Sequence, residues 1–169
     1  LRLPKTGAVY AIVLFVIIYS IILKGGYLTL RNVMNVFHQS ATLCILSISA
    51  FMVILTHQID LSLGSITSLS GVVLGLLLTR GFPLPVAILG AVLSGLLIGV
   101  INGVLAGYTT IQPFVITLST MYIARSIALV LNDGTLAVSN AVLKGFNEAK
   151  LAIVPVPALL ALALFLIFF

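Results

Sequence analysis

The chain has 169 residues, of which 62% are hydrophobic and only 7% are charged. A soluble domain carries about 25% charged residues, so this composition excludes a soluble enzyme, a nucleic-acid-binding domain and a disordered tail. The net charge of +5 comes from single Lys and Arg residues scattered along the sequence, without the basic run that follows a phosphate backbone. The class that remains is an integral membrane protein with several spans, whose partner is the lipid bilayer and not a nucleic acid.

Six apolar runs predict six transmembrane helices, because each is near the length of about 20 residues that crosses a hydrocarbon core. The runs lack the alternation of apolar and polar residues that β-barrel strands show. We therefore predict an all-α fold, a polytopic helical bundle. The predicted spans are residues 7–23, 41–56, 61–79, 84–107, 111–131 and 153–169.

The segment between the first two runs, residues 28–39, has a polarity pattern of its own. Apolar residues recur at helical spacing on one face and polar residues occupy the other: Leu30, Val33, Met34 and Phe37 against Arg31, Asn35 and His38. This pattern predicts either a short helix lying in the headgroup layer or an ordinary connecting helix.

Prolines and polar residues mark the ends of the later runs. Residues 80–85 contain two prolines and predict a tight turn, and Gln112-Pro113 opens the fifth run. Residues 132–150 are the one long polar stretch, which we expect to lie in water on one side of the membrane. The sixth run reaches residue 169 without a closing polar flank, so we expect the sequence to be part of a longer polypeptide.

Asp60 stands between the second and third runs. A carboxylate at the bilayer centre costs about 2.5–3.5 kcal/mol, so we expect Asp60 at an interface, in a cavity or at a helix end. Three roles fit these places. Asp60 caps the third helix by accepting a backbone N–H bond from Ser62 or Leu63, it belongs with Ser62 to a hydrophilic path or gate, or it relays protons.

Small residues recur along the third and fourth runs at every fourth position. They are Gly71 and Gly75 in the third run, and Gly95, Gly99, Gly103 and Gly107 in the fourth. Such stripes let another helix backbone approach closely and predict helix packing, or else a surface that slides between states. Asn102 lies beside the second stripe and is expected to bond to a neighbouring helix or to line a cavity.

Hydrogen-bonding side chains follow the fifth run: Gln112, Thr117, Thr120 and Arg125. A helical Thr can bond to the carbonyls of its own preceding turn, and an Arg can extend its head group to the membrane interface. The functional alternative is that these side chains line a substrate pathway or gate.

The motifs of catalysis are missing. The sequence has neither the Gly-x-x-x-x-Gly-Lys-[Ser/Thr] phosphate loop nor the Gly-x-Ser-x-Gly nucleophile motif. Three acids, two histidines and one cysteine are too few and too dispersed for a metal cage. We therefore expect a protein that moves or binds a molecule, not an enzyme, and one that itself holds no metal or cofactor.

Three segments, in this order and spacing, resemble the permease subunits of bacterial ABC sugar importers of the ribose, galactose, xylose and autoinducer-2 group. They are residues 59–65 (IDLSLGS), Asn102-Gly103 in the glycine-striped run, and residues 111–125 (IQPFVITLSTMYIAR). The family commonly shows Gly-Gly-Ile-Asp-Leu-Ser-Val-Gly-Ser and Ile-Pro-Pro-Phe-Ile-x-Thr-Leu-Gly-Thr-Met. The resemblance covers residues 30–131.

The sequence departs from that family at three turns or helix positions. His57-Gln58 stands where small residues or a glycine pair are usual, and Ser119 and Ser126 stand where glycine is usual. The family's loop that docks on the ATPase lies beyond the last run, so the resemblance implies that this chain is the first half of a permease.

The resemblance implies that two permease subunits, identical or different, form between them a pathway for a monosaccharide or a related polyol. ATP-binding cassette subunits on separate chains, with their ATP and Mg, would drive alternating access, and a periplasmic binding protein would deliver the sugar. The protein would lie in the bacterial inner membrane with a cytoplasmic amino terminus and a periplasmic 132–150 stretch. The Lys and Arg count of the loops favours the opposite orientation.

Two other functions stay open from the residues alone. A proton-coupled secondary transporter would use Asp60 as its titrating group and would need no ATPase. A non-transporting membrane assembly subunit would tolerate apolar replacements at Asn102, Thr117 and Thr120 together.

Overall fold

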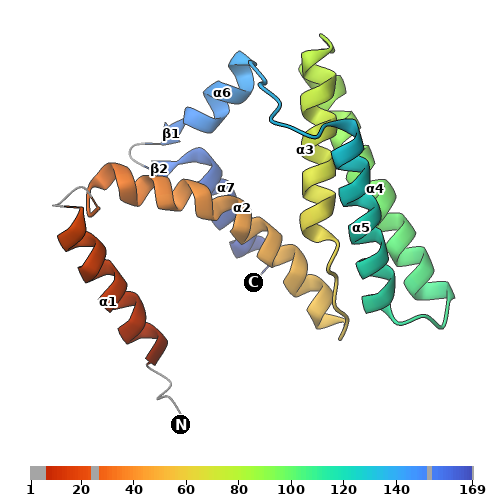
Figure 1. The fold of residues 1–169 in the computed structure, drawn as a ribbon, viewed down its shortest axis with the longest axis horizontal. Coiled ribbons are helices and arrows are strands. Elements are labelled where there is room, and N and C mark those ends of the chain that lie inside the picture. Colours follow the sequence, from red (N-terminus) through yellow and green to blue (C-terminus); the bar gives the residue numbers. More distant parts are fainter. Residues whose placement is uncertain (1–6, 24–26, 152–153, 169) are drawn as a thin grey trace.

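The computed structural model describes residues 7–23, 27–151 and 154–168. Helices dominate this part of the chain and confirm the predicted all-α class (Figure 1). Their bounds are α1 Gly7–Ile22, α2 Leu30–Leu55, α3 Leu63–Thr79, α4 Leu84–Tyr108, α5 Pro113–Leu131, α6 Ala141–Glu148 and α7 Val156–Phe168. Two residues of β1, Lys150–Leu151, pair antiparallel with the two of β2, Val154–Pro155.

Each of the six predicted spans falls on a helix. Within the described residues, α2, α4 and α5 are long and apolar enough to cross a membrane, whereas α3, α7 and the stretch Val9–Ile22 of α1 are apolar but shorter. Arg2, Lys5 and Lys24, the basic residues that flank the first span in the sequence, lie outside the described residues, as do residues 153 and 169 of the sixth span.

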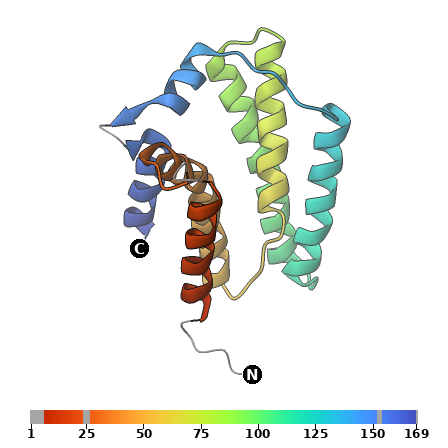
Figure 2. The same ribbon diagram turned by 60° about the vertical axis from the view of Figure 1, so that its left-hand side comes forward.

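The helices α3, α4 and α5 form one bundle and lie side by side in both views (Figures 1 and 2). α3 contacts both of the other two, and α4 also contacts α5. The buried core of this bundle consists of Leu69 on α3, Ile98 on α4, and Ala124 and Ala128 on α5. The two alanines let α5 approach the other helices closely, as small residues do in membrane bundles.

A second group of elements is built on α2, which packs along α7 and contacts β2. The linker after α5 passes over α3, where Leu136 lies beside Gly75, and continues into α6 (Figure 1). α6 contacts α7 and thereby joins this linker to the α2 group. The helix α6 was not predicted within the polar stretch 132–150; its start is stabilised by the Asn140 side chain, which accepts N–H bonds from Val142 and Leu143.

The prediction of a separate helix over residues 28–39 is wrong, because this segment is continuous with the second span in the single helix α2. Thr29 caps its start by accepting the N–H of Asn32 at 3.2 Å. The sequence has no Gly or Pro between Leu30 and Leu55 that would end the helix. At 1.5 Å per residue, α2 is about 39 Å long, which exceeds a hydrocarbon core of about 30 Å.

Two helices end in the same backbone arrangement with different residues. After α3, Gly81 has a φ of 84°, and its N–H and that of Phe82 donate back to Leu78 and Leu77. After α2, His57 takes this position with a φ of 57°, and its N–H donates to Ile54 at 2.8 Å. Glycine adopts this left-handed conformation freely and a histidine does not. The His57 departure from the family pattern therefore falls at a helix end where glycine is favoured.

Candidate functional site

A buried hydrogen-bond network holds the start of α3. Ser62 is fully buried, and both its backbone N–H and its hydroxyl donate to Oδ1 of Asp60, at 2.7 and 2.6 Å. The Nδ2 of Asn102 on α4 donates in turn to the Ser62 hydroxyl oxygen at 2.9 Å. The predicted bond from the Ser62 N–H to Asp60 is therefore confirmed, but the predicted cap is not, because the N-cap position of α3 is Ser62 itself and Asp60 lies two residues before it.

The same segment is tied to α5 by Thr117. Its hydroxyl lies 3.3 Å from the carbonyl oxygen of Ile59 and 3.2 Å from that of Phe114, and it can donate to either. Thr117 is buried, so a bond to a carbonyl oxygen satisfies its hydroxyl where water does not reach it. The linker between α2 and α3 is thus attached to both α4 and α5 by side chains.

One atom of this network has no partner. Oδ1 of Asn102 is buried and accepts no hydrogen bond from any described residue. An unpaired buried acceptor costs about 1–3 kcal/mol, because it has lost its bonds to water and gained none. This oxygen can therefore still accept a hydrogen bond from a water molecule or from another donor.

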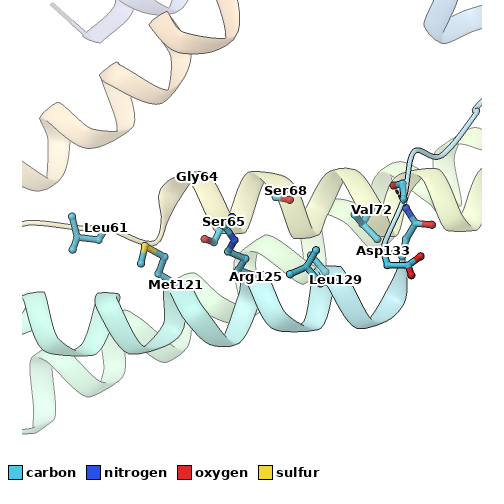
Figure 3. A pocket seen from close by; sticks show the side chains of 12 residues that line it. Leu61, Gly64, Ser65, Ser68, Val72, Met121, Arg125, Leu129 and Asp133 are labelled. Atoms are coloured by element: carbon cyan, nitrogen blue, oxygen red, sulfur yellow. Dashed lines mark hydrogen bonds between the residues drawn. The ribbon is translucent and has the colours of Figure 1, made fainter.

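A cavity of about 540 Å³ lies between α3 and α5 (Figure 3). Its polar lining comes from Ser65, Ser68, Arg125, Asn132 and Asp133, and its apolar lining includes Leu61, Val72, Met121, Ala128 and Leu129. On each helix the first and last lining residues are eight residues apart, about 12 Å along the axis, so the cavity is elongated along the bundle.

Arg125 is the cation of this cavity. Figure 3 shows its side chain reaching from α5 toward Ser65 on α3. Among the described residues it forms no ion pair, and Asp133 lies at the other end of the lining, two helical turns along the chain. The guanidinium therefore keeps its donors free for a molecule in the cavity.

The predicted site residues separate into three groups. Asp60, Ser62, Asn102 and Thr117 come together in the buried network. Arg125 lines the cavity instead. Gln112 is exposed at the start of α5, and the Thr120 hydroxyl bonds to carbonyls of its own helix, as the structural alternative for this residue predicted.

Four polar residues of the cavity were missed by the sequence prediction: Ser65, Ser68, Asn132 and Asp133. A helical spacing was present that would have found the two serines. Ser65, Ser68 and Val72 share one face of α3 at steps of three or four residues. Asn132 and Asp133 follow the end of α5, and no such spacing marks them.

Comparisons with known proteins place the chain in a transport family. Residues 32–169 match the family model described as branched-chain amino acid transport system / permease component. The chain belongs to this permease family. No solved structure matches it.

Individual relatives are transport proteins of bacteria. The permease is 34% identical over 165 residues to the D-allose transport system permease protein of Escherichia coli K12, covering 96% of this chain and 51% of that protein. It is 39% identical over 127 residues to an autoinducer 2 import system permease protein of Escherichia coli, covering 75% of this chain and 37% of the relative. This permease chain thus spans about half, or less, of these relatives.

The glycines of the permease differ in what they contact. A Cβ at Gly95 would lie 3.0 Å from the Ser70 hydroxyl oxygen, so this glycine does allow α4 to approach α3. A Cβ at Gly90, a glycine outside the predicted stripes, would lie closer still to a neighbour, at 2.6 Å from the Leu77 side chain. Gly75 meets Leu136 of the linker, at 3.0 Å, rather than a helix.

The remaining glycines of the two stripes do not pack within the described chain. A Cβ at any of them would meet no atom within 4 Å: Gly71, Gly99, Gly103 and Gly107. No described helix packs closely at these four positions, so the predicted approach of another helix there stays a prediction. Packing against another subunit at the α4 positions stays a prediction.

Proposed function

We propose that this chain is a membrane-spanning subunit of an ABC importer and that its α3/α5 cavity forms part of the pathway for a monosaccharide or related polyol. Membership of the permease family supports a transport role. The relative named for D-allose transport supports a sugar, and the relative named for autoinducer 2 import supports uptake of a substrate as the direction of transport. The observation that carries the proposal is the unpaired Arg125 in an elongated cavity between two apolar helices.

The lining suits a neutral polyhydroxylated molecule. Sugar hydroxyls accept bonds from a guanidinium and donate to a carboxylate, and Arg125 and Asp133 offer one group of each kind. The C–H faces of a sugar ring can lie against Val72 and Leu129. The volume falls within the range of about 300–1,000 Å³ that is usual for small-molecule sites.

The buried network has a positioning role in this proposal. Asp60, Ser62 and Asn102 fix the first turn of α3, and Leu61, Gly64 and Ser65 in and beside that turn line the cavity. A movement of the α2–α3 linker would therefore change the shape of one end of the pathway.

The energy source and the other components lie outside this chain. ATP and Mg would be bound by separate ATP-binding cassette subunits, a second permease subunit would complete the pathway, and a periplasmic binding protein would deliver the substrate. The protein would lie in the bacterial inner membrane with a cytoplasmic amino terminus.

Uptake by the complete importer in proteoliposomes tests the proposal, with radiolabelled D-allose and autoinducer 2 as probes and ATP enclosed with the ATPase. We expect Arg125→Gln to reduce uptake while Arg80→Gln, which changes an exposed Arg at the end of α3, does not. Equal uptake by the two variants contradicts the role of Arg125. Uptake that persists without ATP and stops with an uncoupler contradicts the ABC mechanism and supports a proton-coupled transporter.

A further inference from the structure

A second cavity, of about 580 Å³, lies between the first turns of α2 and the end of α6. Its lining is mainly polar and comes from three elements: Arg31, Met34, Asn35 and His38 on α2, Asn147 and Glu148 on α6, and Pro155 on β2. The polar side chains that the sequence showed at residues 28–39 therefore line a cavity. They form one of its walls.

The two walls are joined and their charges are left unpaired. Nε2 of His38 lies 3.1 Å from the carbonyl oxygen of Asn147, and this contact holds the end of α6 against α2. Arg31 and Glu148 carry opposite charges in the same cavity, yet neither forms an ion pair with a described residue. A donor group and an acceptor group thus remain for a bound molecule.

The cavity lies where a membrane-spanning α2 would leave the hydrocarbon core. The helix has 26 residues, about six more than the roughly 20 that cross that core, and its charged, amide and imidazole side chains are confined to its first three turns. Beside them, Leu30 and Phe37 are more than half exposed, at 60% and 53%. These two side chains share an apolar face of the helix that is distinct from the face of Arg31, Asn35 and His38, and lipid chains can cover it beside the cavity.

We propose that this cavity binds the phosphoethanolamine head group of a membrane phospholipid. The guanidinium of Arg31 donates to the phosphate, and the carboxylate of Glu148 accepts from the ammonium group. A purely anionic head group has no ammonium group to neutralise the Glu148 carboxylate. A choline head group has no N–H to donate, so the carboxylate favours ethanolamine over choline.

Lipid binding by the purified full chain tests the proposal. The delipidated protein is placed in nanodiscs of phosphatidylcholine that contain equal small amounts of phosphatidylethanolamine and phosphatidylglycerol with identical acyl chains, and retained lipid is measured by mass spectrometry. We expect phosphatidylethanolamine to be enriched over both others. Soluble phosphoethanolamine, offered as a competitor, tests whether the acyl chains contribute; we expect it to compete only weakly.

Substitutions at Glu148 and Arg31 test the separate roles of the two charged side chains. Glu148→Gln should reduce the preference for ethanolamine over choline by about tenfold, the change expected from losing one charged hydrogen bond, while Arg31→Gln should weaken retention of every phospholipid. Lys144→Gln is the matched control, because Lys144 is on α6 but does not line this cavity. For Glu148→Gln the ratio of two head groups is measured within one sample, and for Arg31→Gln retained lipid is measured per folded protein, so a partial loss of folded protein imitates neither result.

Three outcomes would overturn the proposal. These are an unchanged head-group ratio in Glu148→Gln together with unchanged phospholipid retention in Arg31→Gln, enrichment of phosphatidylglycerol in place of phosphatidylethanolamine, and full displacement of the lipid by soluble phosphoethanolamine at matched concentration. The last would show a site for a free zwitterion rather than for a lipid.

Discussion

The side-chain nitrogen of Asn102 on α4 donates to the hydroxyl of Ser62 at 2.9 Å, across 40 residues of sequence. The same hydroxyl donates to Asp60, so one serine connects a helix in the middle of the chain with the start of α3. Because Ser62 is fully buried, no water replaces a partner that is removed. The predictions for Ser62, Asn102 and Asp60 rest on the difference between a buried group that loses its partner and one that keeps it.

Ser62→Ala should destabilise the protein more than Asn102→Leu. The serine change leaves Nδ2 of Asn102 without its acceptor, beside an Oδ1 that is already unpaired, at a cost of about 1–3 kcal/mol. The asparagine change removes the unpaired oxygen and leaves Ser62 bonded to Asp60. The free energies of unfolding in detergent decide the order, and a larger loss for Asn102→Leu would contradict it.

Asp60→Asn should lower uptake more than it lowers the amount of protein in the membrane. An asparagine oxygen can still accept the N–H and hydroxyl of Ser62, so the helix start is kept and only the charge is lost. Asp60→Ala is the comparison, since it loses the bonds as well and should cost about 1 kcal/mol of stability. Equal losses of uptake and abundance in Asp60→Asn would mean that Asp60 serves only the fold.

His57→Gly should stabilise the protein by about 1 kcal/mol, because glycine has no Cβ to oppose the left-handed backbone. The position is exposed, so little packing is lost with the ring. Gly81→Ala makes the reverse change at the equivalent position after α3. It should destabilise the protein by a similar amount. Thermal midpoints of the two variants test the pair, and shifts of the same sign would refute the backbone argument.

Gly95→Leu and Gly99→Leu should separate folding from assembly. At Gly95 the added side chain meets Ser70 and Ile66, at 3.0 and 3.3 Å from the Cβ position, and such overpacking costs about 1–3 kcal/mol. At Gly99 no described atom lies within 4 Å, so the chain should fold normally. We expect Gly99→Leu to reduce association with the second permease subunit, measured by co-purification. Normal association would show that this face of α4 does not contact that subunit.

The helices themselves were predictable because apolar runs of membrane length and prolines at helix starts act locally. The start of α5 at Pro113 and the turn before Leu84 follow from the fixed φ of proline and its missing N–H. The continuity of α2 was not predicted, since polar residues in its first turns imitate a separate interfacial helix.

The candidate site was predictable only in part, and for a physical reason. The Asp60 bond to Ser62 spans two residues, so the local sequence was enough to predict it as one of the roles of Asp60. The choice among long-range partners was made by the packing of α3 against α4 and α5, which turned Asn102 and Thr117 inward to the network, Arg125 into the cavity, and Gly99 to an open face. Apolar composition and local turn chemistry fixed the helices, whereas the direction of each polar side chain depended on which helix lay beside it.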